Sequence, residues 1–405
     1  MSVEIRSIGE KSDLVEAVKT FRTAMIGLPR LASISDAMLE RLYEGGRTLA
    51  AFDDGLMVGT TNSYSGEIVV PGGGRLPHAA VTHVGVLATK ARTGIARALM
   101  TRQLRQARDS GDVLATLRAT EASIYGNFGY AVASVSADYE IDRRRAVLRK
   151  ELRGLRPVRY AAVENSWDLQ ARIYSSQPDP RPGSISRSDR WWNGPEGRLG
   201  SEGRMHYLVT CGAEGNETGY VRYRPLSDQA WVESTNRTVL VNDLVAHTDA
   251  DYAALVEHLL SIDIVHRILM PVRPMDDPLP WMIADCRSAR ITGTLDETWL
   301  RLVDTETALS RRAYQGAGEV VVDIRDDLLP DNTVRLRISS LGVCRTDERP
   351  QVVTDVSCVS AVYLGGASWW QLAASGRLHD APREATNTLD SLFSVSRQPF
   401  AGTMF

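Results

Sequence analysis

The stretch VGVLATKARTGIA, residues 84–96, changes from strand-like to helix-like sequence within a few positions. Apolar residues run into a polar turn, and Gly94 then precedes small apolar residues. A strand that turns directly into a helix exposes the first backbone N–H groups of that helix, and the helix dipole adds positive potential there. Such a junction suits a bound phosphate. On the string alone, a plain strand–helix turn that tolerates a glycine is favoured over a phosphate site, because turns with glycine are common.

The sequence around this stretch alternates between strand and helix patterns. Upstream, apolar periodicity predicts strands at 3–9 and within 47–70, with helices at 12–26 and 35–43 and a loop at 71–77. Strands alternating with helices predict a layered α/β domain. The segments around and after the junction are expected to be a strand at 79–88, a helix at 93–110, a strand at 113–119, and a short helix that ends at Gly126 or Gly129 before a further strand.

The rest of the chain shows two more regions. A second α/β region is predicted over about 158–285, with a long Pro/Gly/Ser/Arg-rich loop at 175–197. Beyond it, short strands precede Ala- and Leu-rich helices, which indicates an α+β region. Its strands are expected at 318–326, 333–339 and 350–366. A length of 405 residues fits two or three domains rather than one core.

Composition excludes several classes of protein. A net charge of −3 gives no reason to expect nucleic acid or an anionic membrane as partner. The first residues lack an apolar core and no apolar run approaches about 18 residues, so we expect a cytoplasmic protein without signal peptide or membrane span. The cysteines lie far apart, which predicts reduced core thiols and no bound metal. They are Cys211, Cys286, Cys344 and Cys358.

A second motif, TEASIYGNFGYA at residues 120–131, follows the junction by about thirty residues. Tyr125 lies on its predicted short helix, and a buried phenol can act as a general acid toward a thiolate leaving group. The alternative is a core aromatic residue that packs beside Ile124, Phe128 and Tyr130. On the motif alone, the core position is the favoured interpretation.

Together, the two motifs resemble the GNAT superfamily of acetyl-coenzyme A-dependent N-acetyltransferases. Members carry an Arg/Gln-x-x-Gly-x-Gly/Ala turn after their fourth strand. This chain departs from that pattern at the first position, which is Ala91, so that side chain's phosphate contact is lost or shifted to Arg92. The resemblance assigns the cofactor's acetyl group and pantetheine arm to the backbone of residues 84–86, and its pyrophosphate to residues 92–96. The cofactor-binding residues it implies are Val84, Gly85, Val86, Arg92, Thr93, Gly94, Ile95, Ala96 and Thr120.

A narrower resemblance covers the whole chain. The segments THVGVLATKARTGIARALM, RATEASIYGNFGY, RPGSISRSDRWW and VYLGGASWWQLAASGRL occur in the order found in the Eis (enhanced intracellular survival) family. That family implies tandem GNAT-like domains followed by a sterol-carrier-like domain, and a homo-hexamer. The expected boundaries are 1–145 for the acetyltransferase domain, 146–288 for a second GNAT-like domain without the cofactor turn, and 289–405 for the sterol-carrier-like domain.

The resemblance also implies a reaction. Family members acetylate amines with acetyl-CoA, including several positions of aminoglycosides in some members. Tyr125 matches the general acid of the family, and the terminal carboxylate, here on Phe405, matches the base. An aromatic last residue can anchor the tail by burying its ring, whereas the alternative is a tail held only by packing or subunit contacts. We therefore expect Tyr125 and Phe405 to be catalytic.

The substrate is left more open. Relatives that accept aminoglycosides carry acids where this chain has Thr23 or Ala24 and Met404, so a less acidic pocket is expected. Strand alternation places His83 on the face opposite Val84, where packing is favoured over catalysis. Trp191 and Trp192 either line an acceptor pocket or pack two domains together. Alternatives to a small-molecule acetyltransferase are a lysine acetyltransferase acting on proteins or peptides and a non-catalytic ligand-binding or sensory protein.

Overall fold

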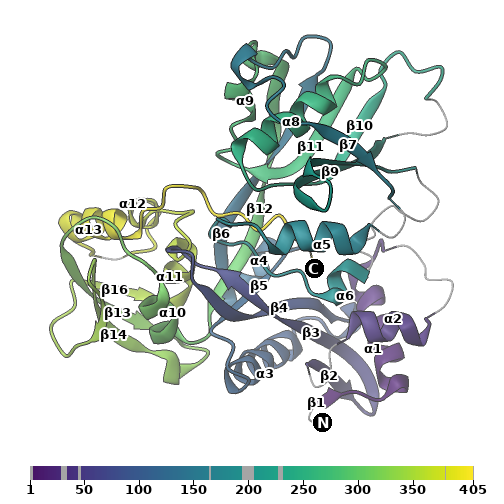
Figure 1. The fold of residues 1–405 in the computed structure, drawn as a ribbon. Helices are drawn as coiled ribbons and strands as arrows, with labels where there is room; N and C mark the ends of the chain where they lie inside the picture. Colours follow the sequence, from purple (N-terminus) through teal and green to yellow (C-terminus); the bar gives the residue numbers. More distant parts are fainter. Residues whose placement is uncertain are drawn as a thin grey trace. The chain divides into compact units, whose positions relative to one another are not determined.

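The computed structural model describes residues 3–28, 34–43, 47–163, 166–193, 205–226, 231–378 and 380–404. The chain divides into two compact units (Figure 1). The first comprises Met1–Ser134, Arg181–Gly194 and Asp296–Phe405, and the second comprises Val135–Pro180 and Pro195–Leu295. Strands β6 (Ala131–Asp142) and β12 (Ala289–Leu302) contain residues of both units, so the chain twice passes between units within a strand.

The N-terminal part of the first unit is a sheet covered by helices. Its strands follow the order β1-β2-β3-β4-β5-β12, in which β4 and β5 are parallel and β12 pairs antiparallel with β5. The α/β prediction for this region is confirmed. The elements are β1 (Glu4–Ile8), α1 (Lys11–Met25), α2 (Asp36–Leu42), β2 (Thr48–Asp53), β3 (Leu56–Val69), β4 (Arg75–Val86), α3 (Ile95–Asp109), β5 (Leu114–Leu117) and α4 (Ala122–Tyr125).

Alternation along β2 distributes the helices over the two faces of this sheet. Ala50 packs with residues of α1 and α2, whereas Leu49 and Ala51 pack with Ile95 and Leu99 of α3. Successive side chains of a strand point to opposite faces, so each helix layer receives its own set of apolar residues. The consequence is that α3 begins beside the end of β4, on the opposite face from α1.

The C-terminal part of the first unit has a separate four-stranded sheet of order β15-β14-β13-β16. Helix α13 packs against β13, and the ring centroids of Trp369 on α12 and Phe393 on α13 lie 5.4 Å apart. The elements are α10 (Thr305–Arg311), β13 (Glu319–Arg325), β14 (Val334–Ser339), β15 (Gly342–Arg345), β16 (Val352–Asp355), α11 (Val356–Val362), α12 (Trp369–Ala374) and α13 (Arg383–Phe393).

The strand predicted over 350–366 is wrong after Asp355. The side chain of Asp355 accepts a hydrogen bond from the Cys358 amide at 2.8 Å and caps helix α11 (Val356–Val362). An N-cap satisfies a free helical N–H group and can outweigh the strand propensity of a short β-branched run. The predicted loop at 71–77 is also shorter in the structure, because β4 already begins at Arg75.

The second unit repeats the strand–helix–strand arrangement of the first. Its strand order is β6-β11-β10-β9-β8-β7, with β10 and β11 parallel and α8 between them in sequence. The α/β prediction for this region is also confirmed. The elements are β7 (Val158–Ala161), α5 (Trp167–Ser175), β8 (Tyr207–Ala213), β9 (Asn216–Pro225), β10 (Thr238–Ala246), α8 (Asp249–Leu260), β11 (Arg267–Pro274) and α9 (Leu279–Met282); α6 (Asp189–Asn193) belongs to the first unit.

All four cysteines are free thiols, but only two lie in the core. Cys211 and Cys358 are buried, whereas Cys286 and Cys344 are exposed, so the core assignment is wrong for the latter pair. Cys344 lies on β15, which is an edge strand of the C-terminal sheet. Within the described ranges, no group of three or more metal-ligating side chains comes together and no helix has the length and apolarity to cross a membrane.

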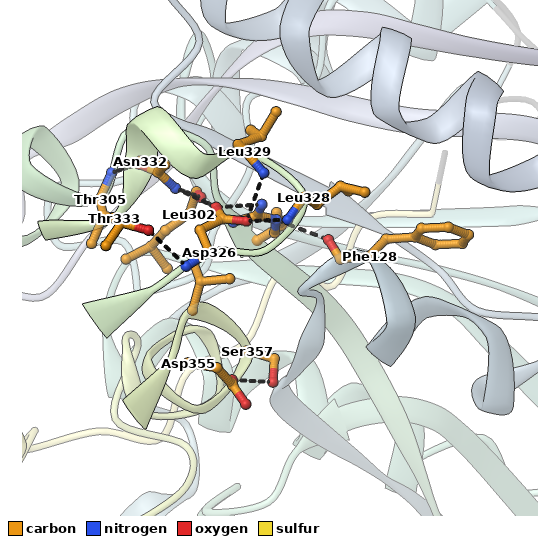
Figure 2. A network of polar contacts seen from close by, with 12 residues as sticks. Phe128, Leu302, Thr305, Asp326, Leu328, Leu329, Asn332, Thr333, Asp355 and Ser357 are labelled. Carbon is orange, nitrogen blue, oxygen red and sulfur yellow. Dashed lines mark hydrogen bonds and ion pairs between the residues drawn. The ribbon is translucent and has the colours of Figure 1, made fainter. Parts of the chain in front are cut away.

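A buried ion pair connects the parts of the first unit. Arg301 of β12 is fully buried and donates to the Phe128 carbonyl at 2.9 Å and to Asp326 at 2.6 Å. Figure 2 shows the backbone amides of Leu328 and Leu329 converging on the same carboxylate. Phe128 belongs to the turn that follows α4. The ion pair therefore attaches this turn to the C-terminal sheet.

Replacing Asp326 with Ala leaves the Arg301 charge buried and uncompensated. We expect the free energy of unfolding to fall by about 3–5 kcal/mol, which is the usual cost of breaking a buried pair by removing one partner. Urea denaturation followed by tryptophan fluorescence measures this loss. Glu348→Ala removes an ion pair with Arg337 in which both side chains are partly exposed, and it should cost less than about 1 kcal/mol. Equal losses for the two variants would contradict the role given to Asp326.

Candidate active site

The sheet of the first unit opens where β4 and β5 end. The parallel ladder between them stops at Ala80–Thr116, although β4 continues to Val86. On its other side, β4 remains paired with β3 through Gly59–Val86 and Thr60–Gly85. The β5-facing backbone groups of the last β4 residues therefore have no ladder partner. Open α/β sheets bind ligands in this position, beyond the carboxyl ends of parallel strands.

A bulge at the end of β4 changes the orientation of its side chains. The register with β3 shifts between Thr60 and Asn62, and His83 has a φ of +51°. The expected strict alternation around His83 is therefore wrong, because one extra residue lies on the bulged strand. The Cβ that a substitution would add at Gly85 lies 3.0 Å from the Ala24 side chain of α1. This close approach brings the α1 stretch and the end of β4 together.

His83 is an unusual side chain in this position. Its ring lies 4.7 Å from that of Phe21 and 5.7 Å from that of Tyr43, and its buried Nδ1 makes no hydrogen bond within the described chain. Burial, assisted by the nearby charge of Arg22, lowers the pKa of His83 to about 4. The imidazole is consequently neutral at pH 7. It forms an aromatic wall beside the end of β4, in agreement with the packing that the sequence favoured.

The turn between β4 and α3 exposes its backbone. A short 3₁₀ segment, Ala88–Lys90, is followed by Arg92 with φ +62° and Gly94 with φ +88°. Residues with positive φ turn successive N–H groups toward a common centre, and a non-glycine residue in this region is strained. The Thr93 hydroxyl donates to the Lys90 carbonyl at 2.7 Å and fixes the turn. Lys90 itself pairs with Asp53, so its charge is already partly compensated.

The corresponding helices of the two units differ at their N-termini. Helix α3 begins after Gly94 with no side-chain cap and no acidic residue in its first turn. Helix α8 is capped by Thr248, which forms a reciprocal capping box with Asp251, and Asp249 adds a second carboxylate. A capped, acidic N-terminus has fewer free N–H groups and repels anions. Of the two described strand–helix junctions, the α3 junction is therefore the better site for a phosphate.

Tyr125 lies at the same edge of the sheet, on the helix after β5. The ring is buried between Tyr130, at 6.2 Å, and Trp299, at 6.3 Å. Burial raises the pKa of Tyr125 above its ordinary value, so the phenol remains protonated at neutral pH. A protonated phenol at the edge of an open sheet can donate a proton. Thr120, one residue before the Glu121 cap of α4, is exposed at the same edge.

The C-terminal segment reaches this edge and is held by a buried carboxylate. Glu297 of β12, which is 2% exposed, accepts the backbone N–H groups of Ala401 at 3.2 Å and Gly402 at 2.8 Å. Arg118, directly after β5, donates to the Glu297 carboxylate at 2.7 Å and to the Thr403 carbonyl at 2.6 Å. Phe405, the expected catalytic residue, lies outside the described residues. The residues just before it are fixed beside the end of β5.

The loop around 181–193 holds the same segment from a second side. The Arg187 guanidinium donates to the Gly402 carbonyl at 3.0 Å and to the Thr403 hydroxyl at 3.1 Å, and it stacks on the Trp191 ring at 4.2 Å. Trp191 donates its indole N–H to the Met404 carbonyl at 2.5 Å. This contact makes Trp191 an anchor for the tail. Neither interpretation of Trp191 from the sequence included that role.

The structure thus places the predicted residues around the ends of two adjacent strands. Val84 to Ala96 form the end of β4 and the start of α3, and Thr120 and Tyr125 follow β5. Sequence reasoning missed the residues that hold the tail, which are Glu297, Arg118 and Arg187. The isolated arginine at the end of the apolar strand 113–119 was the only local signal, and it does not identify a partner 179 residues away.

Three family models match successive parts of the chain. An acetyltransferase (GNAT) domain matches residues 4–133, a second acetyltransferase (GNAT) domain matches 183–302, and a sterol carrier protein domain matches 305–402. Among solved structures, a GCN5-related N-acetyltransferase from Anabaena variabilis has a TM-score of 0.84 at 17% identity over both whole chains, which shows the fold alone. The predicted fold class of tandem GNAT domains followed by a sterol-carrier-like domain is confirmed.

Relatives at higher identity identify the family. Eis1 from Mycobacterium abscessus superposes with a TM-score of 0.90 at 42% identity, over 100% of both chains. An uncharacterized N-acetyltransferase from Streptomyces avermitilis is 33% identical over 100% of this chain and 99% of its own length. The N-acetyltransferase Eis of Mycobacterium tuberculosis is 28% identical over 90% of this chain and 92% of its own. The chain therefore belongs to the Eis family of GNAT-superfamily N-acetyltransferases.

Proposed function

We propose that this N-acetyltransferase transfers the acetyl group of acetyl-CoA to a primary amine of a small molecule by direct attack. The observation that carries the proposal is the uncapped N-terminus of α3, which follows Gly94 at the open edge of the sheet. A buried, protonated Tyr125 lies at the same edge. An anion site and a proton donor beside unpaired strand backbone fit a phosphate-bearing thioester and its leaving thiolate.

Each part of the edge has a proposed role toward the donor. The unpaired backbone of Val84, Gly85 and Val86 binds the pantetheine arm and the acetyl carbonyl. The turn and the first helical N–H groups bind the pyrophosphate, with Gly94 leaving open space because nothing lies within 4 Å of the position where a Cβ would be. The proposed pyrophosphate-binding residues are Arg92, Thr93, Gly94, Ile95 and Ala96, and Thr120 completes the cofactor site from the end of β5.

The proposed chemistry needs one acid and one base. The acceptor nitrogen attacks the thioester carbonyl, the carbon–sulfur bond breaks as the tetrahedral species collapses, and Tyr125 gives its proton to the departing thiolate. The carboxylate of Phe405 takes the proton that the amine loses. Holding an acid and a base on opposite sides of the reacting carbon supplies orientation as well as proton transfer.

The surroundings favour acceptors of low charge. Thr23, Ala24 and Met404 provide no carboxylate, and His83 is neutral with the positive charge of Arg22 nearby. A polycation gains little in such surroundings. We also propose that the functional domains extend over 1–145, 146–288 and 289–405, that the capped α8 helix leaves the second domain without a cofactor, and that the enzyme is a cytoplasmic homo-hexamer.

Acceptor-dependent release of the free thiol of CoA tests the proposed reaction. A panel of monoamines, diamines, tri- and tetracationic aminoglycosides and a lysine-containing peptide is incubated with acetyl-CoA and enzyme. We expect the highest kcat/KM for small acceptors with one or two positive charges. Preference for the peptide would assign the enzyme to protein substrates, and absence of thiol release with every amine would contradict the proposal.

The cofactor turn is tested by Gly94→Glu. The new carboxylate occupies the open space in front of the helix N-terminus and repels the pyrophosphate, so acetyl-CoA should bind at least about 30-fold more weakly, or about 2 kcal/mol. Isothermal titration measures the affinity.

Gly111→Glu is the matched control for this variant. Gly111 ends the same helix with a φ of +84°, close to the +88° of Gly94, and also has nothing within 4 Å of a would-be Cβ. The two substitutions share backbone strain and charge but differ in distance from the proposed phosphate. If the two variants bound acetyl-CoA with equal affinity, the proposed pyrophosphate site at Gly94 would be wrong.

The general acid is tested by Tyr125→Phe, which should lower kcat about 100-fold with little change in acetyl-CoA affinity. Because burial raises the pKa of Tyr125, the acid keeps its proton up to about pH 10, and wild-type activity should fall through this group only above that pH. That alkaline decrease should be absent in the variant.

Tyr130→Phe provides the control for Tyr125. Tyr130 lies 6.2 Å away, is 1% exposed, and has a buried hydroxyl without a partner in the described chain. Its loss should leave kcat within about twofold, under 0.5 kcal/mol. If both variants kept wild-type kcat under conditions where chemistry limits the rate, Tyr125 would be a core residue only.

A further inference from the structure

The buried Glu297 carboxylate that holds the C-terminal segment accepts hydrogen bonds at both of its oxygens. Besides the amides of Ala401 and Gly402, Glu297 accepts Arg118, the Ser134 hydroxyl at 2.6 Å and the Thr298 hydroxyl at 3.2 Å. A carboxylate offers about four lone-pair positions, so every one of them is used. Two of these bonds come from the tail, and the others come from Ser134 on β6, Thr298 on β12 and Arg118 directly after β5. The side chain is therefore a junction between the chain end and the catalytic edge.

From this geometry we propose that Glu297 is a positioning residue, which acts through Arg118 to hold residues 401–404 where Phe405 can serve as the base. The inference rests on the proposed function, since it assumes that Phe405 carries the base. Consecutive Cα atoms are about 3.8 Å apart across a trans peptide, so fixing Thr403 and Met404 restricts the position of the next residue. Glu297 itself touches no substrate in this account.

The same residue is connected to the proposed acid. Trp299 lies two positions after Glu297 on β12, and its ring packs against Tyr125 at 6.3 Å. Trp299 pairs with Leu117 of β5, the residue immediately before Arg118. The short element β5–β12 thus carries both the contact with the acid and the clamp on the tail. A shift of Glu297 would therefore disturb both the packing on Tyr125 and the contacts that hold residues 401–403.

Charge is needed for this junction. Burial on its own would raise the pKa of Glu297, but Arg118, the Ser134 hydroxyl and the Gly402 amide together hold the pKa below its ordinary value. The group is thus ionised at the pH of catalysis. A Gln at this position keeps the shape, yet its NH₂ group must face a donor, because donors surround both carboxylate oxygens.

The test compares Glu297→Gln with a matched control, Asp277→Asn. Asp277 in the second unit has the same kinds of donor: Arg273 at 2.9 Å, the Tyr252 hydroxyl at 2.7 Å and the Leu279 amide at 3.0 Å. Three quantities are measured in the full-length enzyme: hydrogen exchange of the C-terminal peptide, acetyl-CoA affinity, and kcat for thiol release.

We expect Glu297→Gln to raise exchange of the tail amides at least about tenfold and to lower kcat up to about 100-fold, the effect of a misplacement near 1 Å. Acetyl-CoA affinity should stay within about twofold, and Asp277→Asn should leave tail exchange and kcat near wild type. Unchanged tail exchange, or an equal kinetic loss in both variants, would overturn the proposal. Trp191→Phe, which removes the indole N–H donor to Met404 and reduces the ring on which Arg187 stacks, should shift exchange and kcat in the same direction with smaller size.

Deletion of Phe405 in both backgrounds separates this inference from the proposed base. If Glu297 acts through the tail, the deletion should cost the wild type about 10-fold or more and the Glu297→Gln variant less than about twofold. If the kcat losses caused by Glu297→Gln and by the deletion multiplied, Glu297 would act independently of Phe405, and the inference would be overturned. If the deletion left wild-type kcat unchanged, the proposed base would be wrong, and Glu297 could not be a positioning residue for it.

Discussion

Strands β4 and β5 run parallel, yet their ladder stops at Ala80–Thr116 while β4 continues to Val86. The opened edge leaves strand backbone available and places the start of α3 and the helix after β5 on either side of the gap. The bulge at His83 belongs to the same feature, because it turns the end of β4 away from its regular register. Without this opening, Gly94 and Tyr125 would flank a closed sheet. Both proposed roles therefore depend on where one ladder ends.

Strand β12 connects this edge to the rest of the first unit. Glu297 binds the C-terminal segment, Trp299 packs on Tyr125, and Arg301 forms the buried pair with Asp326. Alternate residues of a strand face the same side, so β12 presents all three contacts from one face. Buried charges that are fully hydrogen-bonded specify one arrangement of their partners. Strand β12 therefore connects the C-terminal segment, Tyr125 and the C-terminal sheet of the first unit.

Local signals in the sequence predicted the local parts of this site. The run at 84–96 predicted the strand, turn and helix because glycine placement and apolar periodicity act within a few residues. The motif at 120–131 suggested Tyr125 as an acid, but only the resemblance favoured that role over a core position, since its burial beside Trp299 depends on a residue far along the chain. The bulge at His83 was not predicted, because it is set by pairing with β3. The pairing of Glu297 with Arg118 was not predicted, because an isolated arginine in the sequence does not identify a partner 179 residues away.

The two units offer similar strand–helix junctions, but of helices α3 and α8 it is α3 that has the uncapped, acid-free N-terminus suited to a phosphate. We therefore expect one acetyl-CoA site in each chain, in the first unit. Isothermal titration of the wild-type enzyme with acetyl-CoA measures the number of sites directly. We expect one acetyl-CoA per chain. Hydrogen exchange should show protection by acetyl-CoA at 84–97 and none at 249–252. Two sites per chain, or protection at the start of α8, would contradict a single acetyl-CoA site in the first unit.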